Sequence, residues 1–232
     1  MEILAIIPAR CGSKGLPHKN ILELAGKPMI AYSIEHALTS KLIMRVIVST
    51  DSENYMEIAR KFGAETPFIR PEKFAKDESL DIDVFHHALT WLRDNENYVP
   101  DICVQLRPCY PFRQPIVIDK IIQHLIDNPS FDSVRSITKS KELPYKMWHL
   151  AEDDSLIPVM KEIKECYNMS RHQLPTTYTQ TGYADVFRPY VVLEQYSMTG
   201  KKIGGYLTDD YIDIDNHDDF VFAEKQMKIF YI

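Results

Sequence analysis

Cations and glycines are concentrated in a short stretch near the N-terminus, residues 9–20. Arg10, Lys14 and Lys19 supply three positive charges, and two glycines allow backbone N–H groups to approach an anion closely. These residue types predict a loop that binds a polyphosphate. The spacing differs from both the Gly-x-x-x-x-Gly-Lys-Ser/Thr and the Gly-x-Gly-x-x-Gly patterns. A solvated basic loop without a ligand is the alternative interpretation.

Two acids near the C-terminus, Asp213 and Asp215, are separated by one apolar residue. If residues 211–215 form a strand, both carboxylates point to the same side of it. Two carboxylates this close repel each other, and a hard divalent cation such as Mg²⁺ would offset that repulsion while also binding substrate phosphates. Asp215 alone would suit a cap of the following helix, but the pair favours a metal site.

The cationic loop and the acid pair together indicate nucleotidyl transfer. Attack on the α-phosphorus of a nucleoside triphosphate expels pyrophosphate, and such a reaction depends on positioned cations and a metal. We find no Ser-His-Asp or Cys-His arrangement in the sequence and therefore expect no covalent intermediate. The sequence does not identify the general base.

The elements that must position these groups follow from the apolar pattern. Strands are expected at residues 3–7, 45–49, 66–69, 102–106 and 133–138. Helical stretches separate them, with apolar faces at Ile30, Ile34, Ala37 and Leu38, at Ile82, Phe85, Leu89 and Leu92, and at Ile118, Ile121, Ile122 and Leu125. A further helix is expected from Glu53 to Phe62. This alternation predicts an α/β fold, with a mostly parallel sheet covered by helices on both faces.

The alternation is interrupted at residues 139–178, which are rich in aromatic side chains, charge and proline. We predict a small β-rich arm there, and a nucleotidyltransferase core formed by residues 1–138 and 179–232. The apolar side chains of the arm suggest a contact in a homodimer. The core then continues with strands at 178–187, 203–207 and 211–215, a short helix at 189–196, and a last helix capped by Asn216.

Composition excludes several classes of protein. The chain has 232 residues, is 45% hydrophobic and carries a net charge of −6, which argues against a general nucleic-acid binder. No apolar run approaches 18 residues, so we expect no membrane span and no membrane partner. The N-terminus lacks the pattern of a signal peptide. Four cysteines without Cys-x-x-Cys spacing suggest reduced thiols and a cytoplasmic location.

Residues 7–20 closely resemble the opening motif of the acylneuraminate cytidylyltransferases, the CMP-sialic acid synthetases. Residues Ile212–Asp215 resemble the metal motif of the family, and these two motifs are specific together. Weaker resemblances lie between them, at Ser49–Ser52, at Phe68–Pro71 with Asp77, Ser79 and Ile82–Val84, and at Arg171–Pro175. The resemblance implies a Rossmann-like nucleotidyltransferase fold with a small dimerisation arm. It also implies transfer of CMP from CTP to an acidic 2-keto sugar such as neuraminate, legionaminate or pseudaminate, for a surface polysaccharide.

Matching positions of the family motifs imply roles for individual residues. Arg10, Ser13, Lys14 and Lys19 would hold the triphosphate, and Asn20, Arg70 and Ser79 would contact the nucleoside. Asp213 and Asp215 would bind Mg²⁺ and, with Arg10 and Lys19, form the catalytic set. Lys146 and Arg171 would meet the carboxylate side of the sugar acid, in the same subunit or across a dimer.

The sequence departs from the family pattern after the fourth core strand. The family typically has Gln-Pro-Thr-Ser-Pro-Leu-Arg there, whereas residues 107–113 read Arg-Pro-Cys-Tyr-Pro-Phe-Arg. Because Arg107 is a fixed cation without acceptor capacity, we hypothesise that it contacts the acceptor and changes the acceptor preference. Pairing of Arg107 with a carboxylate is the structural alternative. Other acceptors (an octulosonate-like acid, a phosphate or a phosphonate) and a non-catalytic nucleotide-binding protein are the competing functions.

Overall fold

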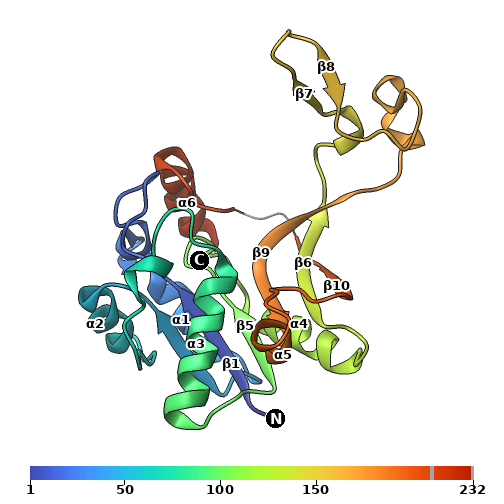
Figure 1. The fold of residues 1–232 in the computed structure, drawn as a ribbon. Helices are drawn as coiled ribbons and strands as arrows, with labels where there is room; N and C mark the ends of the chain where they lie inside the picture. Colours follow the sequence, from blue (N-terminus) through green and yellow to red (C-terminus); the bar gives the residue numbers. More distant parts are fainter. Residues whose placement is uncertain (210–211, 231–232) are drawn as a thin grey trace. The chain divides into compact units, whose positions relative to one another are not determined.

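A computed structural model describes residues 1–209 and 212–230 of the chain (Figure 1). Two compact units can be distinguished, one formed by residues 1–136 and 181–232 and the other by residues 137–180. The first unit contains the central sheet and all the helices of four or more residues. The second unit is a β-hairpin with short 3-10 turns.

The central sheet has six strands in the order β10-β6-β9-β5-β1-β4. Their bounds are β1 Ile3–Pro8, β4 Arg45–Ser49, β5 Ile102–Gln105, β6 Ser133–Lys139, β9 Tyr178–Phe187 and β10 Ile203–Leu207. Strand β1 is parallel to both β4 and β5, and β9 is antiparallel to β5. Strands β2 (Glu23–Leu24) and β3 (Lys27–Pro28) form a separate small ladder.

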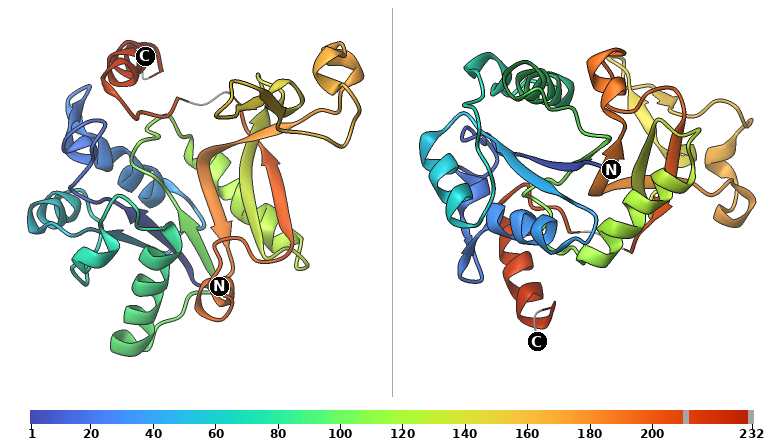
Figure 2. Two further views of the ribbon diagram at one scale, coloured as in Figure 1. Left: turned by 45° about the horizontal axis from the view of Figure 1, so that its top comes forward. Right: turned by 90° about the horizontal axis from the view of Figure 1, so that it is seen from below.

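Helices cover both faces of this sheet, as the sequence predicts. They are α1 Met29–Thr39, α2 Glu53–Lys61, α3 Asp81–Glu96, α4 Pro115–Asp127, α5 Pro189–Leu193 and α6 His217–Phe230. Viewed along the sheet in Figure 2 (right), α3 and α5 lie on one side of the strands and α1, α4 and α6 lie on the other. Short 3-10 turns at Lys19–Ile21 (η1) and Glu72–Phe74 (η2) belong to the same unit.

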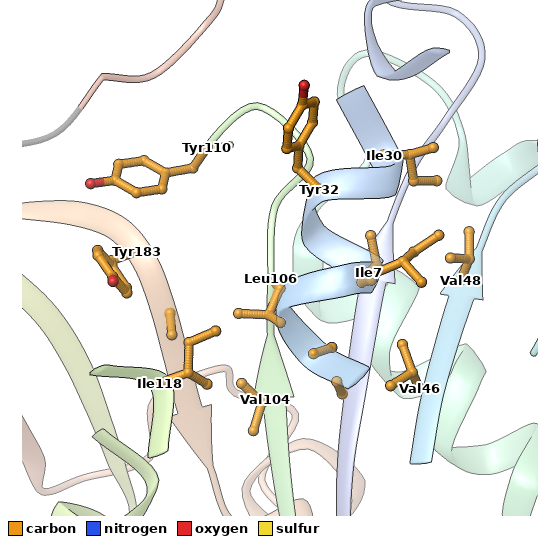
Figure 3. Close-up of a cluster of buried hydrophobic side chains, with 14 of the residues drawn as sticks. Ile7, Ile30, Tyr32, Val46, Val48, Val104, Leu106, Tyr110, Ile118 and Tyr183 are labelled. Atoms are coloured by element: carbon orange, nitrogen blue, oxygen red, sulfur yellow. The ribbon is translucent and has the colours of Figure 1, made fainter. Parts of the chain in front are cut away.

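The alternation of side chains along β1 explains these two layers. Ile3, Ala5 and Ile7 pack into a cluster with α1 and α4, part of which is shown in Figure 3. Leu4 and Ile6 face the opposite way and pack against α3 and α5. Because successive side chains of a strand point to opposite faces, a strand buried on both sides must be apolar throughout. Parallel strands also bring the loops that follow them to one edge of the sheet.

Most of the expected strands and helices are confirmed, but the predictions of two strands are wrong. Residues 66–69 are not a strand; Glu65, one residue earlier, forms a single isolated bridge with Ile47. Pro67 has no N–H to extend that pairing. Residues 212–215 belong to no strand, and Tyr211 lies outside the described residues. Leu38, expected on the buried face of α1, is exposed.

The second unit contains an antiparallel hairpin of β7 (Trp148–Leu150) and β8 (Leu156–Pro158). The remaining backbone forms the 3-10 turns η3 Pro144–Lys146, η4 Cys166–Asn168 and η5 Arg171–Gln173. The hairpin leaves much of its apolar surface exposed, including Leu150 and Leu156. A role in dimerisation stays a prediction.

Among residues 1–209 and 212–230, no helix is both long and apolar enough to cross a bilayer.

Candidate active site

An open cavity of about 350 Å³ lies at the carboxyl end of β1. Its wall comes from the end of β1 and the loop after it, the segment 70–84, the turn after β5 and Asp215, two residues before α6. Nine of the residues singled out in the sequence line it together: Arg10, Ser13, Lys14, Lys19, Asn20, Arg70, Ser79, Arg107 and Asp215. Residues as far apart in the sequence as Arg10 and Asp215 thus line the same cavity.

Contacts with neighbouring loops fix the shape of the loop at residues 9–20. The carboxylate of Asp51 accepts hydrogen bonds from the backbone N–H of Cys11 (2.9 Å) and from its thiol (3.1 Å). Asn20 is buried, and its side-chain amide donates to the backbone carbonyl of Arg10 at 2.9 Å. A Cβ at Gly15 would lie 2.6 Å from the backbone oxygen of Asp215, so only glycine permits this approach.

The cations of this loop make ion pairs with acids at the cavity mouth. Arg10 contacts Asp77 at 2.6 Å, and Lys14 contacts the other oxygen of the same carboxylate. These hydrogen bonds from Lys14 and Arg10 lower the pKa of Asp77. Lys19 contacts Asp215 at 2.8 Å. The loop therefore presents positive charge whose present partners are carboxylates.

Asp213 and Asp215 lie in different surroundings although they are only two residues apart. Asp213 is partly buried, and its Oδ1 has no hydrogen-bond partner within residues 1–209 and 212–230. Burial raises its pKa, and the neighbouring Cys109 thiol opposes this shift. Asp215 is exposed. Between them, Ile214 is buried and its N–H donates to the carbonyl of Cys109 at 3.0 Å.

The start of α6 does not need the side chain of Asp215. Oδ1 of Asn216 accepts from the N–H of Asp219 at 3.0 Å, and the Asp219 carboxylate accepts from the N–H groups of Asp215 and Asn216. Asn216 is thus the helix cap, as predicted. The side chain of Asp215 is left facing the cavity.

The donor set of this acid pair fits a hard divalent cation. Carboxylate oxygens are the ligands such ions prefer, and one of them, Oδ1 of Asp213, is buried without a partner. Across the described ranges no cluster of three or more potential ligand residues exists. An ion here would therefore share two carboxylates with oxygens of a bound substrate.

Two of the predicted nucleoside contacts already make protein contacts. Arg70 is buried, and its guanidinium donates to the hydroxyl (3.1 Å) and the carbonyl of Ser49 and to the carbonyl of Phe74. Ser79 accepts from the N–H of Lys76 and donates to the carbonyl of Lys73. Both residues shape the segment at 70–80 while they also line the cavity.

Arg107 pairs with carboxylates, which is the alternative to acceptor contact given above, and it also lines the first cavity. Its Nη2 lies 2.5 Å from Asp81, and its Nη1 lies 3.7 Å from the buried carboxylate of Asp185. Asp185 is also paired with Arg135, and Asp81 also accepts from Gln105. Two arginines and two aspartates therefore form a connected network beside the cavity.

Sequence reasoning missed the importance of Arg113, which is almost completely buried. Its guanidinium donates to the carbonyls of Arg107 (2.8 Å), Tyr110 and Tyr183 and to the hydroxyl of Ser33 (3.0 Å). Arg113 therefore fixes the path of the turn that follows β5. An arginine within a proline-rich turn was the only signal available.

The turn held by Arg113 also lines a second cavity, of about 340 Å³. Residues 107–109 face the first cavity, whereas Tyr110, Phe112 and Gln114 face the second. The segment before α6 is divided in the same way, with Asp215 lining the first cavity and Ile212 the second. Asp213 lies between these two residues in sequence.

Lys146 and Arg171 belong to the second unit. Lys146 donates to the carbonyls of Tyr167 (3.1 Å) and Met169 (2.7 Å). Arg171 donates to the carbonyl of Lys141 at 3.3 Å and lies 3.8 Å from Glu142. Their predicted contact with an acceptor stays a prediction.

Comparisons with known proteins cover nearly the whole chain. The family profile with the description "Cytidylyltransferase" matches residues 4–232. The chain is 32% identical to the CMP-N,N'-diacetyllegionaminic acid synthase of Legionella pneumophila, over 99% of this chain and 97% of that protein.

Two further relatives match over part of their length. The N-acylneuraminate cytidylyltransferase of Escherichia coli is 40% identical over 61% of this chain, which corresponds to only 32% of that protein. The pseudaminic acid cytidylyltransferase of Campylobacter jejuni is 36% identical over 56% of each chain. Among solved structures, the CMP:2-keto-3-deoxy-manno-octonic acid synthetase complexed with CTP superposes with a TM-score of 0.74 at 18% identity, over 99% of each chain. This last likeness concerns the fold.

Proposed function

The chain belongs to the cytidylyltransferase family, and from that premise we propose that it transfers CMP from CTP to an acidic 2-keto sugar with release of pyrophosphate. The observation that carries the proposal is that the cationic loop and Asp215 line one cavity, and that Asp213, two residues away, has a buried carboxylate oxygen without a partner. The activities named for three relatives favour a sialic-acid-like acceptor of the neuraminate, legionaminate or pseudaminate type.

In this mechanism the loop binds the triphosphate. Arg10, Lys14 and Lys19 contact phosphate oxygens, with Ser13 as a further donor, and their charges offset the charge that develops as pyrophosphate leaves. The nucleoside lies toward Asn20, Arg70 and Ser79. Arg70 and Asn20 act there mainly by holding backbone segments in place, since their donors are already engaged.

The chemical step is a direct displacement. The anomeric hydroxyl of the acceptor forms a bond to the α-phosphorus, the bond from the α-phosphorus to the bridging oxygen of the β-phosphate breaks, and the hydroxyl proton passes to solvent. Asp213 and Asp215 would hold Mg²⁺, which supplies Lewis-acid stabilisation of the phosphoryl oxygens. The partnerless Oδ1 of Asp213 supports this assignment.

We place the acceptor in the second cavity, on the far side of the turn at 107–114. The reason is that the same two segments line both cavities, so ligands in the two hollows would approach each other near Asp213. Arg107 lines the first cavity, on the other side of this turn, so it would meet the acceptor where the two ligands come together. Its contact with Asp81, a partly exposed carboxylate, is one that a substrate carboxylate can replace.

Release of pyrophosphate tests the reaction. The purified protein is incubated with CTP, Mg²⁺ and, separately, N-acetylneuraminate, legionaminate, pseudaminate and octulosonate. We expect release with one sialic-acid-like acid, and a loss of at least about a hundredfold for Asp213→Asn. Glu57→Gln, which changes an exposed acid on α2, is the control. Binding of CTP without release in any arm would contradict transfer to these acids and favour a phosphate or phosphonate acceptor or a non-catalytic role.

Arg107→Gln tests the acceptor hypothesis separately. We expect the KM for the acceptor to rise by about tenfold, or the order of preference among the acids to change, with little effect on the KM for CTP. An unchanged preference and an unchanged catalytic efficiency would leave Arg107 as a purely structural partner of Asp81 and Asp185.

A homodimer in which the arm completes the acceptor site is the remaining part of the proposal, and the protein is expected to act in the cytoplasm. Lys146→Met and Asp213→Asn are each expected to be weakly active alone. If Lys146 serves the site of the partner subunit, a mixture of the two variants regains part of the activity, because one site of the mixed dimer is intact. No recovery in a demonstrated mixed dimer would contradict action across the interface.

A further inference from the structure

Asp77 is a partly exposed acid whose two carboxylate oxygens contact different cations of the loop at residues 9–20. Oδ1 lies 2.6 Å from Nη1 of Arg10, and Oδ2 contacts Nζ of Lys14. The two cations are four residues apart in the loop, so one carboxylate bridges them. A bridging carboxylate and a bridging phosphate use the same donors, because both offer anionic oxygens to charged N–H groups.

A short turn presents Asp77 at the cavity mouth. The side chain of Ser79 accepts from the N–H of Lys76 (3.0 Å) and donates to the carbonyl of Lys73 (3.2 Å), which closes the turn between η2 and α3. Lys76, Asp77 and Ser79 all line the cavity, as do Arg10 and Lys14. Asp77 therefore connects two walls of the cavity through its side chain alone.

The exposure of Lys14 and Asp77 determines the strength of the ion pair between them. The side chain of Lys14 is 81% exposed and that of Asp77 is 32% exposed. Exposed ion pairs contribute little to stability because water and salt screen them. A ligand with several negative charges can therefore take over both cations, whereas a neutral ligand cannot.

We infer that Asp77 is a displaceable internal counter-ion, which competes with the phosphates of the substrate for Arg10 and Lys14. While Asp77 contacts Arg10 and Lys14, it keeps the two cations in position. Its competition for them weakens the binding of any polyphosphate and assists the departure of that ligand. The inference rests on the proposed function only for the identity of the polyphosphate, which would be CTP on entry and pyrophosphate on exit.

Titration calorimetry of Asp77→Asn against the wild-type protein tests the competition. CTP, tripolyphosphate, pyrophosphate and uncharged cytidine are titrated without acceptor at low salt. We expect Kd values for the three anions to fall by about three- to tenfold in the variant, and the difference to shrink in about 0.5 M salt. Cytidine should show no change. Asp77→Glu, which keeps the charge, should resemble the wild type, and Glu57→Gln controls for net charge.

The outcomes separate the inference from the proposed function. If a folded Asp77→Asn variant binds the anions no more tightly than the wild type does, the inference is overturned. The proposed function still stands in that case, provided that the wild type binds CTP. Tighter tripolyphosphate binding in a protein that does not bind CTP would support the counter-ion and contradict the function. Failure of both proteins to bind any of the anions would overturn both. Thermal unfolding checks the fold of each variant.

Discussion

The charges at the rim of the cavity and those in the interior of the first unit use the same residue types for different ends. At the rim, Arg10 and Lys14 contact a carboxylate and remain partly or largely exposed. In the interior, Arg70 and Arg113 are buried and donate mainly to backbone carbonyls. A carboxylate at the surface can be exchanged for a phosphate, but a buried carbonyl has no replacement donor.

The role of an arginine near a ligand site therefore depends on the groups that its guanidinium contacts. Burial lowers the pKa of Arg70 and of Arg113 to about 10, which still leaves both groups charged at neutral pH. A buried guanidinium engaged with carbonyls holds loops, and the loops hold the ligand. On the proposed function, a rim guanidinium would hold the ligand itself. The predictions below test this division.

Arg113→Met gives the largest expected effect. Methionine fills part of the volume but leaves the carbonyls of Arg107, Tyr110 and Tyr183 without their donor, so the free energy of unfolding should fall by about 3–5 kcal/mol. Urea unfolding followed by circular dichroism measures it. A loss below about 1 kcal/mol would mean that Arg113 contributes as little to stability as an exposed charge at the rim.

Arg10→Met should weaken CTP binding and leave the stability of the fold nearly unchanged. We expect the Kd for CTP to rise by about 10- to 100-fold, because a charge-assisted contact to phosphate is lost, while the free energy of unfolding changes by less than about 1 kcal/mol. Calorimetric binding and urea unfolding on the same preparation supply both numbers. A large loss of stability with unchanged CTP affinity would remove the distinction between rim and interior.

His36 adds an acid-sensitive interior group near Arg113. Burial, helped by the charge of Arg113, lowers its pKa to about 3, whereas an unfolded histidine has a pKa of about 6.5. The unfolded state therefore binds the proton more readily, and this contribution to stability is lost as the pH falls below 6.5. We expect a loss of about 2 kcal/mol by pH 5. Urea unfolding at pH 7 and 5 should show a smaller difference for His36→Gln; an equal difference would contradict the assignment.

Arg70→Lys gives the smallest effect and tests the residue that could belong to either group. One ammonium cannot reach both Ser49 and Phe74 as the guanidinium does, so unfolding should become easier by about 1–2 kcal/mol. The Kd for CTP should change by less than about threefold once the variant is folded. A greater loss of CTP affinity with unchanged stability would make Arg70 a direct nucleoside contact.

The sequence was sufficient for the elements whose signals are local. The apolar run of β1 and the cap at Asn216 depend on neighbouring residues, and both agree with the prediction. Residues 212–215 alternate like a strand but meet no partner strand, and pairing is a property of the whole fold. The contacts of Arg113 with Ser33 and Tyr183 span 80 and 70 residues, so no local pattern could indicate them.

The candidate site was predicted in part for the same reason. The cations and glycines between residues 10 and 20 predict an anion-binding loop from residue type alone, and the structure places these cations at one cavity. The bridging of two of those cations by Asp77 requires the segment before α3 to lie across the cavity mouth, which is a tertiary arrangement. The two carboxylate partners of Arg107 were foreseen as a possibility, but only the fold identifies them as Asp81 and Asp185.

The way in which Arg113 holds the turn after β5 has a consequence for how this enzyme can diversify. Its guanidinium binds the carbonyl oxygens of residues 107 and 110, which every amino acid would provide. The course of the turn is thus largely independent of the side chains displayed along it. Positions 107 and 109 can therefore drift in evolution, or be randomised in a mutational library, while the scaffold that presents them stays the same.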